Sequence, residues 1–161
     1  MVSSYALMDP KAVISEVIAA DTAVHSTVRE LAVHDPLGRL RASVQGDGSV
    51  MDLHGDLLAY IEADGSVGAP DMAYIGEVTA PNEASVGFVT DKDDELVAEV
   101  DYGLGTIRGP TGSTIAAITR NGEVSGHTGV RCGILEGFSY AHLRTAAAYL
   151  TLVDPAFLEG K

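Results

Sequence analysis

The chain contains six tandem repeats of about seventeen residues, and this fixed period constrains the fold more than any other feature. The first aliphatic residues of the units, taken as position 0, are Val33, Val50, Val67, Val89, Ile107 and Val124. Position 9 is always small: Ala42, Ala59, Gly76, Ala98, Ala116 and Gly133. Position 11 is always aliphatic: Val44, Ile61, Val78, Val100, Ile118 and Leu135. Position 5 is glycine in four units, at Gly38, Gly55, Gly112 and Gly129, whereas Met72 and Asp94 stand in the other two.

Each unit is predicted to be a β-hairpin. In the clearest unit, a short strand from Val50 ends at a turn closed by Gly55, and a longer strand follows over residues 57–62. Asp64 and Gly65 then form the next tight turn, because Asp-Gly between apolar runs favours a positive-φ hairpin turn. Six such units predict about twelve short antiparallel strands, arranged either as a closed, barrel-like ring or as an extended sheet.

The small residue at position 9 and the aliphatic residue at position 11 lie two residues apart, so they share one face of the strand. A small side chain in every unit indicates close approach on the buried face, where a larger one would collide with the neighbouring repeat. Residues such as Tyr60, Glu62, Glu99 and Ala117 are expected on the opposite face, where water or a partner meets them.

Helices are expected on both sides of the repeats, which divides the chain into residues 1–31, 32–137 and 138–161. Asp9 and Pro10 open an N-terminal helix, and a second helical stretch runs from Thr22 to Leu31. Ser139 is expected to cap a C-terminal helix from Tyr140 to about residue 152, which the Asp-Pro pair at 154–155 ends. These helices either cover the terminal repeats or dock onto another protein.

Composition excludes several classes of function. The 161 residues suit one domain, and 46% hydrophobic content favours a folded chain over a disordered one. A formal net charge of −13 with only ten basic residues disfavours nucleic acids and anionic membranes as partners, whereas a basic protein partner remains compatible. Because Cys132 is the only cysteine and no segment has the length of a membrane span or the form of a signal peptide, we expect a cytoplasmic protein.

The residue types that carry chemistry do not form a reactive pattern. His34, His54 and His127 occupy different positions of their repeats, so a ring of equivalent metal ligands is not expected. The acidic run at 91–95 lacks the glycine and terminal glutamate of a calcium loop and is interpreted as a solvated turn. The Gly-Pro-Thr-Gly-Ser run at 109–113 lacks the lysine of a phosphate-binding loop, and Cys132 at position 8 is interpreted as a packed thiol. We therefore expect no catalytic residue, no metal and no cofactor.

The units at residues 55–65 and 112–122, and more loosely 38–48, resemble the short hairpin repeats of bacterial β-flower domains. Those repeats read approximately Gly-x-x-aliphatic-Ala-x-Ile-x-x-Asp-Gly. Residues 33–40 also resemble a single tyrosine-aspartate (YD) shell repeat, and the hairpin principle is shared with membrane-occupation (MORN) repeats, whose period is longer. The resemblance implies a radial or laterally extended hairpin array and brings no catalytic residue with it.

The sequence favours a non-enzymatic structural or protein-interaction module within a larger assembly, for which a cytoskeletal or ciliary setting is suitable. The reason is that its regularity lies in packing positions, while polar positions vary between units. The partner is either another protein or a second copy of the chain. The alternative is a small-ligand binder, because a closed ring of hairpins leaves an axial cavity.

Overall fold

The computed structural model describes residues 30–161. Both helices expected before the repeats fall almost wholly outside the described residues. The expected end of the second helix is wrong, because Leu31 begins the first strand, where its amide and carbonyl groups join the sheet.

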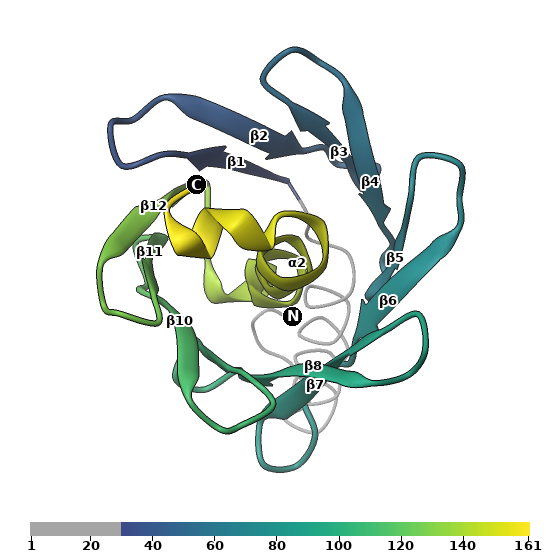
Figure 1. The fold of residues 1–161 in the computed structure, drawn as a ribbon, viewed down its shortest axis with the longest axis vertical. Coiled ribbons are helices and arrows are strands. Elements are labelled where there is room, and N and C mark those ends of the chain that lie inside the picture. Colours follow the sequence, from purple (N-terminus) through teal and green to yellow (C-terminus); the bar gives the residue numbers. More distant parts are fainter. Residues whose placement is uncertain (1–29) are drawn as a thin grey trace, which may run out of the picture.

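The repeats form a closed antiparallel barrel of twelve strands (Figure 1). In chain order these are β1 (Leu31–His34), β2 (Leu40–Val44), β3 (Ser49–Asp52), β4 (Leu57–Ile61), β5 (Ser66–Gly68), β6 (Tyr74–Val78), β7 (Val86–Asp91), β8 (Leu96–Asp101), β9 (Thr106–Arg108), β10 (Thr114–Ile118), β11 (Glu123–Gly126) and β12 (Arg131–Glu136). Each strand pairs with its neighbours in sequence, and β12 returns to pair with β1, with Val33 opposite Leu135. The mainly β prediction is confirmed, and of the two expected arrangements the ring is the one observed.

The barrel has two different rims. The loop rim consists of the six connections within hairpins, from β1–β2 to β11–β12, and each contains position 5 of its repeat. All six position-5 residues adopt positive φ, including Met72 at 72° and Asp94 at 62°. The turn rim consists of the connections between hairpins, such as that at Gly65. The carbonyl of Gly65 accepts a hydrogen bond from the amide of Val78 in the next hairpin, at 2.9 Å.

Every hairpin carries a β-bulge at position 8. In the first unit Val33 lies opposite Ala42 and His34 opposite Leu40, so Arg41 has no partner across the ladder. The same register shift isolates the other position-8 residues: Leu58, Ile75, Val97, Ile115 and Cys132. Because a classic bulge places two successive side chains on one side of the strand, positions 8 and 9 both face the lumen.

Positions 0, 9 and 11 form the inner wall of the barrel and are buried in all six units. The small residues at position 9 are required by close approach. A Cβ on Gly76 would overlap the carbonyl of Thr90 on the neighbouring strand and lie 3.1 Å from the Leu152 side chain. A Cβ on Gly133 would lie 2.7 Å from the ring of Phe157. Both a neighbouring strand and the C-terminal segment therefore limit the size of position 9.

The C-terminal segment passes through the lumen from the turn rim to the loop rim (Figure 1). It comprises 3₁₀ turns at Tyr140–His142 (η1) and Pro155–Glu159 (η3), an α-helix at Leu143–Ala148 (α2) and a π-helical turn at Tyr149–Val153 (η2). The expected single helix from Tyr140 is therefore divided into several helical types, and Asp154 ends only the π turn. Because a closed barrel has no terminal repeat to cover, this segment fills the interior instead.

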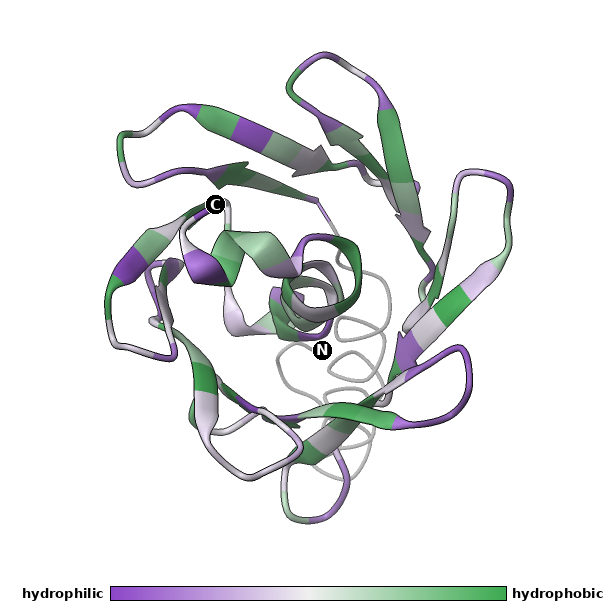
Figure 2. Cartoon of the chain, viewed as in Figure 1, coloured by the Kyte–Doolittle hydropathy of each residue, from purple (hydrophilic) through white to green (hydrophobic). Residues whose placement is uncertain are grey.

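The apolar faces of the strands and of the C-terminal segment meet inside the barrel, whereas the loops are largely hydrophilic (Figure 2). In the part of the chain that the structure describes, no helix has the length and apolarity that crossing a membrane requires.

Candidate functional site

The barrel encloses more space than its own chain fills. Eight strands leave an interior that side chains alone can occupy, so twelve strands surround a wider lumen. One helix with its side chains is about 10–12 Å across. The C-terminal segment packs against β4, β6, β11 and β12 and therefore leaves space on the side of β8–β10.

An ion pair fixes this off-centre position of the C-terminal segment. The Arg41 guanidinium on the first bulge donates two hydrogen bonds to Asp154, at 2.6 and 3.0 Å, and lies 5.3 Å from the centre of the Phe157 ring. The Tyr149 hydroxyl donates to the same carboxylate at 2.6 Å. Burial alone would raise the pKa of Asp154, but the hydrogen bonds from Arg41 and Tyr149 outweigh it and hold that pKa below its ordinary value.

Other contacts attach the segment to the same half of the wall. The Cys132 thiol donates to the carbonyl of Leu158 at 3.5 Å, and burial raises the pKa of this thiol. At the opposite end, Arg144 is buried and donates to the carbonyl of Val78 at 2.8 Å and to that of Asp64. Burial raises the pKa of the nearby Tyr102 phenol to about 12. These groups hold the segment in place rather than present a reactive surface.

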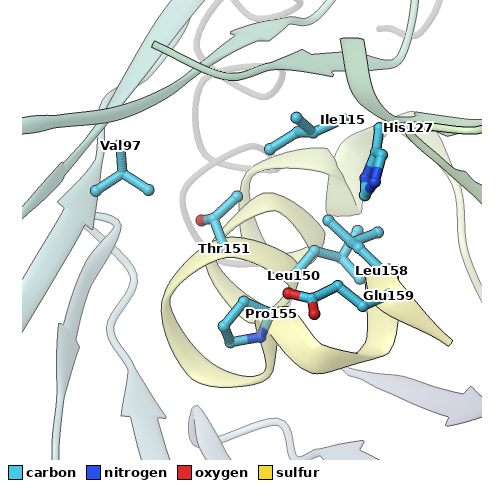
Figure 3. A pocket seen from close by; sticks show the side chains of 8 residues that line it. All are labelled: Val97, Ile115, His127, Leu150, Thr151, Pro155, Leu158 and Glu159. Carbon is cyan, nitrogen blue, oxygen red and sulfur yellow. The ribbon is translucent and has the colours of Figure 1, made fainter. Parts of the chain in front are cut away.

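A cavity of 270 Å³ remains at the loop rim between the C-terminal segment and the wall (Figure 3). Two bulge residues and a loop histidine line it on the barrel side: Val97, Ile115 and His127. The C-terminal segment contributes Leu150, Thr151, Pro155, Leu158 and Glu159. Its interior is therefore apolar, and its polar groups are the Thr151 hydroxyl and the two exposed side chains of His127 and Glu159. We refer to it as the mouth cavity.

The loop rim around the mouth cavity is acidic. Nine carboxylates lie on the six loops, on the strand ends beside them or on η3: Asp35, Asp52, Asp56, Asp71, Asp91, Asp93, Asp94, Glu95 and Glu159. Five basic side chains lie at the same positions: Arg39, Lys92, Arg108, Arg131 and Lys161. Three of these form ion pairs, Arg39 with Asp35 at 2.7 Å, Lys161 with Glu159 at 3.3 Å and Arg108 with Glu99. The field at this end of the barrel therefore attracts cations.

The outer surface has a separate feature at position 7. Leu40, Tyr74 and Leu96 are 45%, 42% and 46% exposed, and Leu57 at the same position is half-buried. Thr114 and Arg131 occupy position 7 in the last two units. We call Leu40, Leu57, Tyr74 and Leu96 the outer apolar stripe. It covers one part of the barrel wall, because the four residues belong to consecutive hairpins.

The structure does not bring the expected candidate residues together. His34 bonds Glu136 at 2.9 Å across the seam between β1 and β12, His54 lies on another loop, and His127 lies at the mouth cavity. Within residues 30–161 no three histidine, cysteine or acidic side chains gather in a way that could hold a metal ion.

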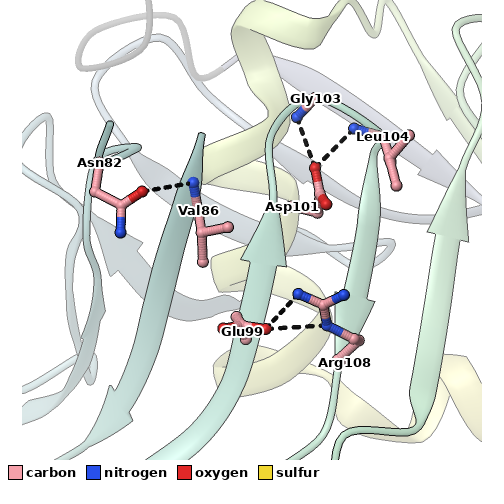
Figure 4. A network of polar contacts seen from close by, with 7 residues as sticks. All are labelled: Asn82, Val86, Glu99, Asp101, Gly103, Leu104 and Arg108. Atoms are coloured by element: carbon pink, nitrogen blue, oxygen red, sulfur yellow. Dashed lines mark hydrogen bonds and ion pairs between the residues drawn. The ribbon is translucent and has the colours of Figure 1, made fainter. Parts of the chain in front are cut away.

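Polar groups near the irregular third and fourth units stabilise turns and strand pairs. The Asp91 carboxylate accepts from the amides of Asp93 and Glu95, at 2.9 and 3.0 Å, so the acidic run is an Asp-stabilised turn. Asn82 and Asp101 bind loop amides in the same way, and Glu99 pairs with Arg108 across β8 and β9 (Figure 4). The run at 109–113 is a hairpin loop in which Gly112 has φ of 90°.

Sequence reasoning missed the mouth cavity and the outer apolar stripe. The stripe had a signal, namely leucine or tyrosine at position 7 of four consecutive units. The cavity had none, because it depends on where the C-terminal segment lies in the lumen. Comparison of the chain with family models, with curated proteins and with solved structures gives no match.

Proposed function

We propose that this chain is a non-enzymatic interaction module whose outer apolar stripe binds another protein. The observation that carries the proposal is the exposure of large apolar side chains at one repeat position in four consecutive hairpins, where the last two hairpins have Thr114 and Arg131. Large apolar side chains that are exposed at one repeat position along the wall are a feature that protein binding explains. Tyr74 gives the stripe an aromatic residue of the type that dominates binding energy in interfaces.

Charge indicates the kind of partner. The chain carries a net charge of −13, and Glu77 lies on the outer face beside Tyr74, whose hydroxyl donates to it at 3.0 Å. Two copies meeting through this face would bring like charges together, which opposes a homo-oligomer. A protein that offers apolar side chains flanked by lysine or arginine is complementary. A cytoplasmic assembly, such as a cytoskeletal or ciliary one, provides the setting that we propose.

The use of potentially reactive residues in packing supports a non-enzymatic role. Cys132 bonds the C-terminal segment, Gly112 closes a hairpin loop, and Asp154 holds Arg41 and Tyr149. Each of these groups has a structural partner that accounts for its position. The barrel therefore acts as a rigid support for its outer surface.

Native mass spectrometry of complexes isolated from the source material tests this function. The wild-type chain should appear in a species heavier than its own 16.7 kDa, and a Tyr74→Glu variant should lose the added mass. Thr114→Glu is the matched control, because it places the same charge at position 7 of a hairpin outside the stripe. Thermal unfolding should show that all variants remain folded. A chain that is always monomeric, or a stripe variant that keeps its partner, would contradict the proposal.

A second candidate, small-ligand binding, has its own supporting observation. The C-terminal segment fills much of the lumen in which sequence reasoning placed an axial cavity. The 270 Å³ mouth cavity beside that segment offers an apolar interior with polar groups only at its edge. Such a combination is typical of sites for small amphiphilic molecules.

A further inference from the structure

We propose that the mouth cavity binds a small cationic amphiphile, with the alkyl part between Val97, Ile115 and Leu150 and the ammonium group beside Glu159. This inference goes beyond the protein-binding role, because the mouth cavity lies inside the loop rim whereas the outer apolar stripe faces outward.

The fold keeps this space open. A helix without fixed contacts in the lumen would pack against the wall so that little apolar volume stays empty, because atoms that line an empty space lose dispersion contacts. Here the pair between Arg41 and Asp154 and the thiol contact of Cys132 with Leu158 hold the segment against the opposite wall. Val97 and Ile115, the bulge residues of the fourth and fifth units, consequently line the mouth cavity. Arg41 and Cys132 bond the C-terminal segment, and they line a separate, more polar pocket with Asp35, Arg39 and Lys161.

The size and lining of the cavity suit a short alkyl chain. Its volume of 270 Å³ corresponds to roughly nine water molecules at about 30 Å³ each. An alkyl chain of about eight carbons would fill the same volume and displace that water. Five of the lining side chains are apolar: Val97, Ile115, Leu150, Pro155 and Leu158. Transfer of an alkyl chain from water to this lining is favourable at approximately 0.8 kcal/mol per buried methylene.

The backbone of the C-terminal segment is irregular where it forms the floor of the cavity. Leu150 and Thr151 belong to the π-helical turn, in which the amide of Asp154 donates to the carbonyl of Tyr149 at 2.8 Å. The Thr151 hydroxyl donates to the carbonyl of Ala147 at 2.6 Å, and its oxygen keeps acceptor capacity toward the cavity. Single π turns within helices occur frequently at functional sites.

The charge of the rim selects a cationic head group. Apolar walls alone would accept any amphiphile, but the loop rim carries nine carboxylates against five basic side chains. Glu159 lines the cavity itself, and its carboxylate forms an ion pair with the exposed Lys161 at 3.3 Å. An ammonium head can replace that lysine at low cost, because exposed pairs contribute little stability. A carboxylate head would be repelled by the same field.

Isothermal titration calorimetry with three probes of equal tail length tests the proposal: octylammonium, octanol and octanoate. We expect octylammonium to bind at least tenfold more tightly than octanoate at low ionic strength, with octanol between them. The preference should shrink in 1 M salt, where the screening length is about 3 Å. Binding of octanol at least as tight as that of octylammonium, or no binding of any probe, would overturn the proposal.

Matched variants locate the site. Val97→Phe should fill part of the cavity and weaken octylammonium and octanol alike by at least fivefold. Leu58→Phe, at the same bulge position in a hairpin away from the cavity, should leave both affinities unchanged.

Glu159→Gln tests the charge at the cavity and should reduce the preference for octylammonium over octanol about threefold, whereas Glu123→Gln at the turn rim should not. Undiminished binding to Val97→Phe places the probe elsewhere and overturns the site. The variant Tyr74→Glu, on a hairpin that does not line the cavity, should not affect octylammonium, so failure of this proposal and failure of the protein-binding role are distinguishable.

Discussion

Replacing Phe157 by alanine is predicted to remove much of the stability of the barrel, although Phe157 belongs to no repeat. Its ring is 2% exposed, lies edge-on to Tyr149 with centroids 6.4 Å apart, and supports the Arg41 guanidinium at 5.3 Å. Truncation of a buried phenylalanine to alanine costs about 3–5 kcal/mol of unfolding free energy. This range includes part of the loss of ring contacts such as those with Tyr149 and Arg41. Because domains of this kind have unfolding free energies of about 5–15 kcal/mol, the loss should be evident in a urea titration.

Phe88→Ala provides a matched control within the same barrel. Phe88 lies on the outer face of β7 and is 38% exposed, so its removal should cost about 1 kcal/mol or less. We expect the two midpoints to differ clearly while the denaturant slopes remain equal. If Phe157→Ala unfolds within about 1 kcal/mol of the wild type, the C-terminal segment is not packed in the lumen and the reasoning is refuted.

Three further predictions follow from local geometry. The pKa of the Asp154 carboxyl is lower in the folded chain than its unfolded value of 3.8. The ionised carboxylate therefore contributes its full stabilisation above pH 3.8, and this stabilisation is lost as pH falls through the folded pKa. Urea titrations at pH 7 and pH 3 should show that Asp154→Asn removes this part of the acid sensitivity. Met72→Gly should stabilise the chain by about 0.5–1 kcal/mol, because Met72 has φ of 72°, and Gly112→Ala should destabilise it by about 1 kcal/mol. If thermal or urea unfolding shows that both variants change the free energy of unfolding in the same direction, the turn assignment is contradicted. Cys132 should react with a thiol reagent at least about a hundredfold more slowly in the native chain than in urea, since opening must precede labelling, and Leu158→Ala should accelerate the native reaction.

The hairpins could be predicted from the sequence because their signals are local. Gly55, Asp64 and Gly65 specify a loop and a turn within sixteen residues, and the strand between them follows. Met72 and Asp94 interrupt the glycine pattern but keep positive φ, because the strands on either side fix the path of the loop. The period therefore predicted the structure even where its most characteristic residue is missing.

Position 8 shows where local reasoning ends. Simple alternation from position 9 would place Val97 and Ile115 on the outer face, but the bulge turns them toward the lumen. A bulge depends on the register between two strands, and the residue types at position 8 range from Arg41 to Cys132. The one signal in the sequence is that position 8 is apolar in five of the six units, directly before the small residue at position 9.

Closure of the ring and the path of the C-terminal segment depend on contacts distant in sequence. The pairing of Val33 with Leu135 requires the twist of all the intervening strands to sum to one turn, which no single repeat encodes. The sequence predicted a C-terminal helix from Tyr140 but not that the barrel would enclose it. The mouth cavity is a consequence of both, and for this reason it has no signature in the sequence.

The most direct test of the account is a solution NOESY spectrum of the isotope-labelled chain. A closed barrel containing its own C-terminal segment predicts three contacts: between the Gly133 Hα and the Phe157 ring, between the Gly76 Hα and the Leu152 methyl groups, and between Val33 and Leu135 across the seam. The first two come from separate walls of the lumen and require the segment to lie between them. Absence of these two cross-peaks from a folded, fully assigned chain would contradict the filled barrel, and absence of the third would contradict its closure.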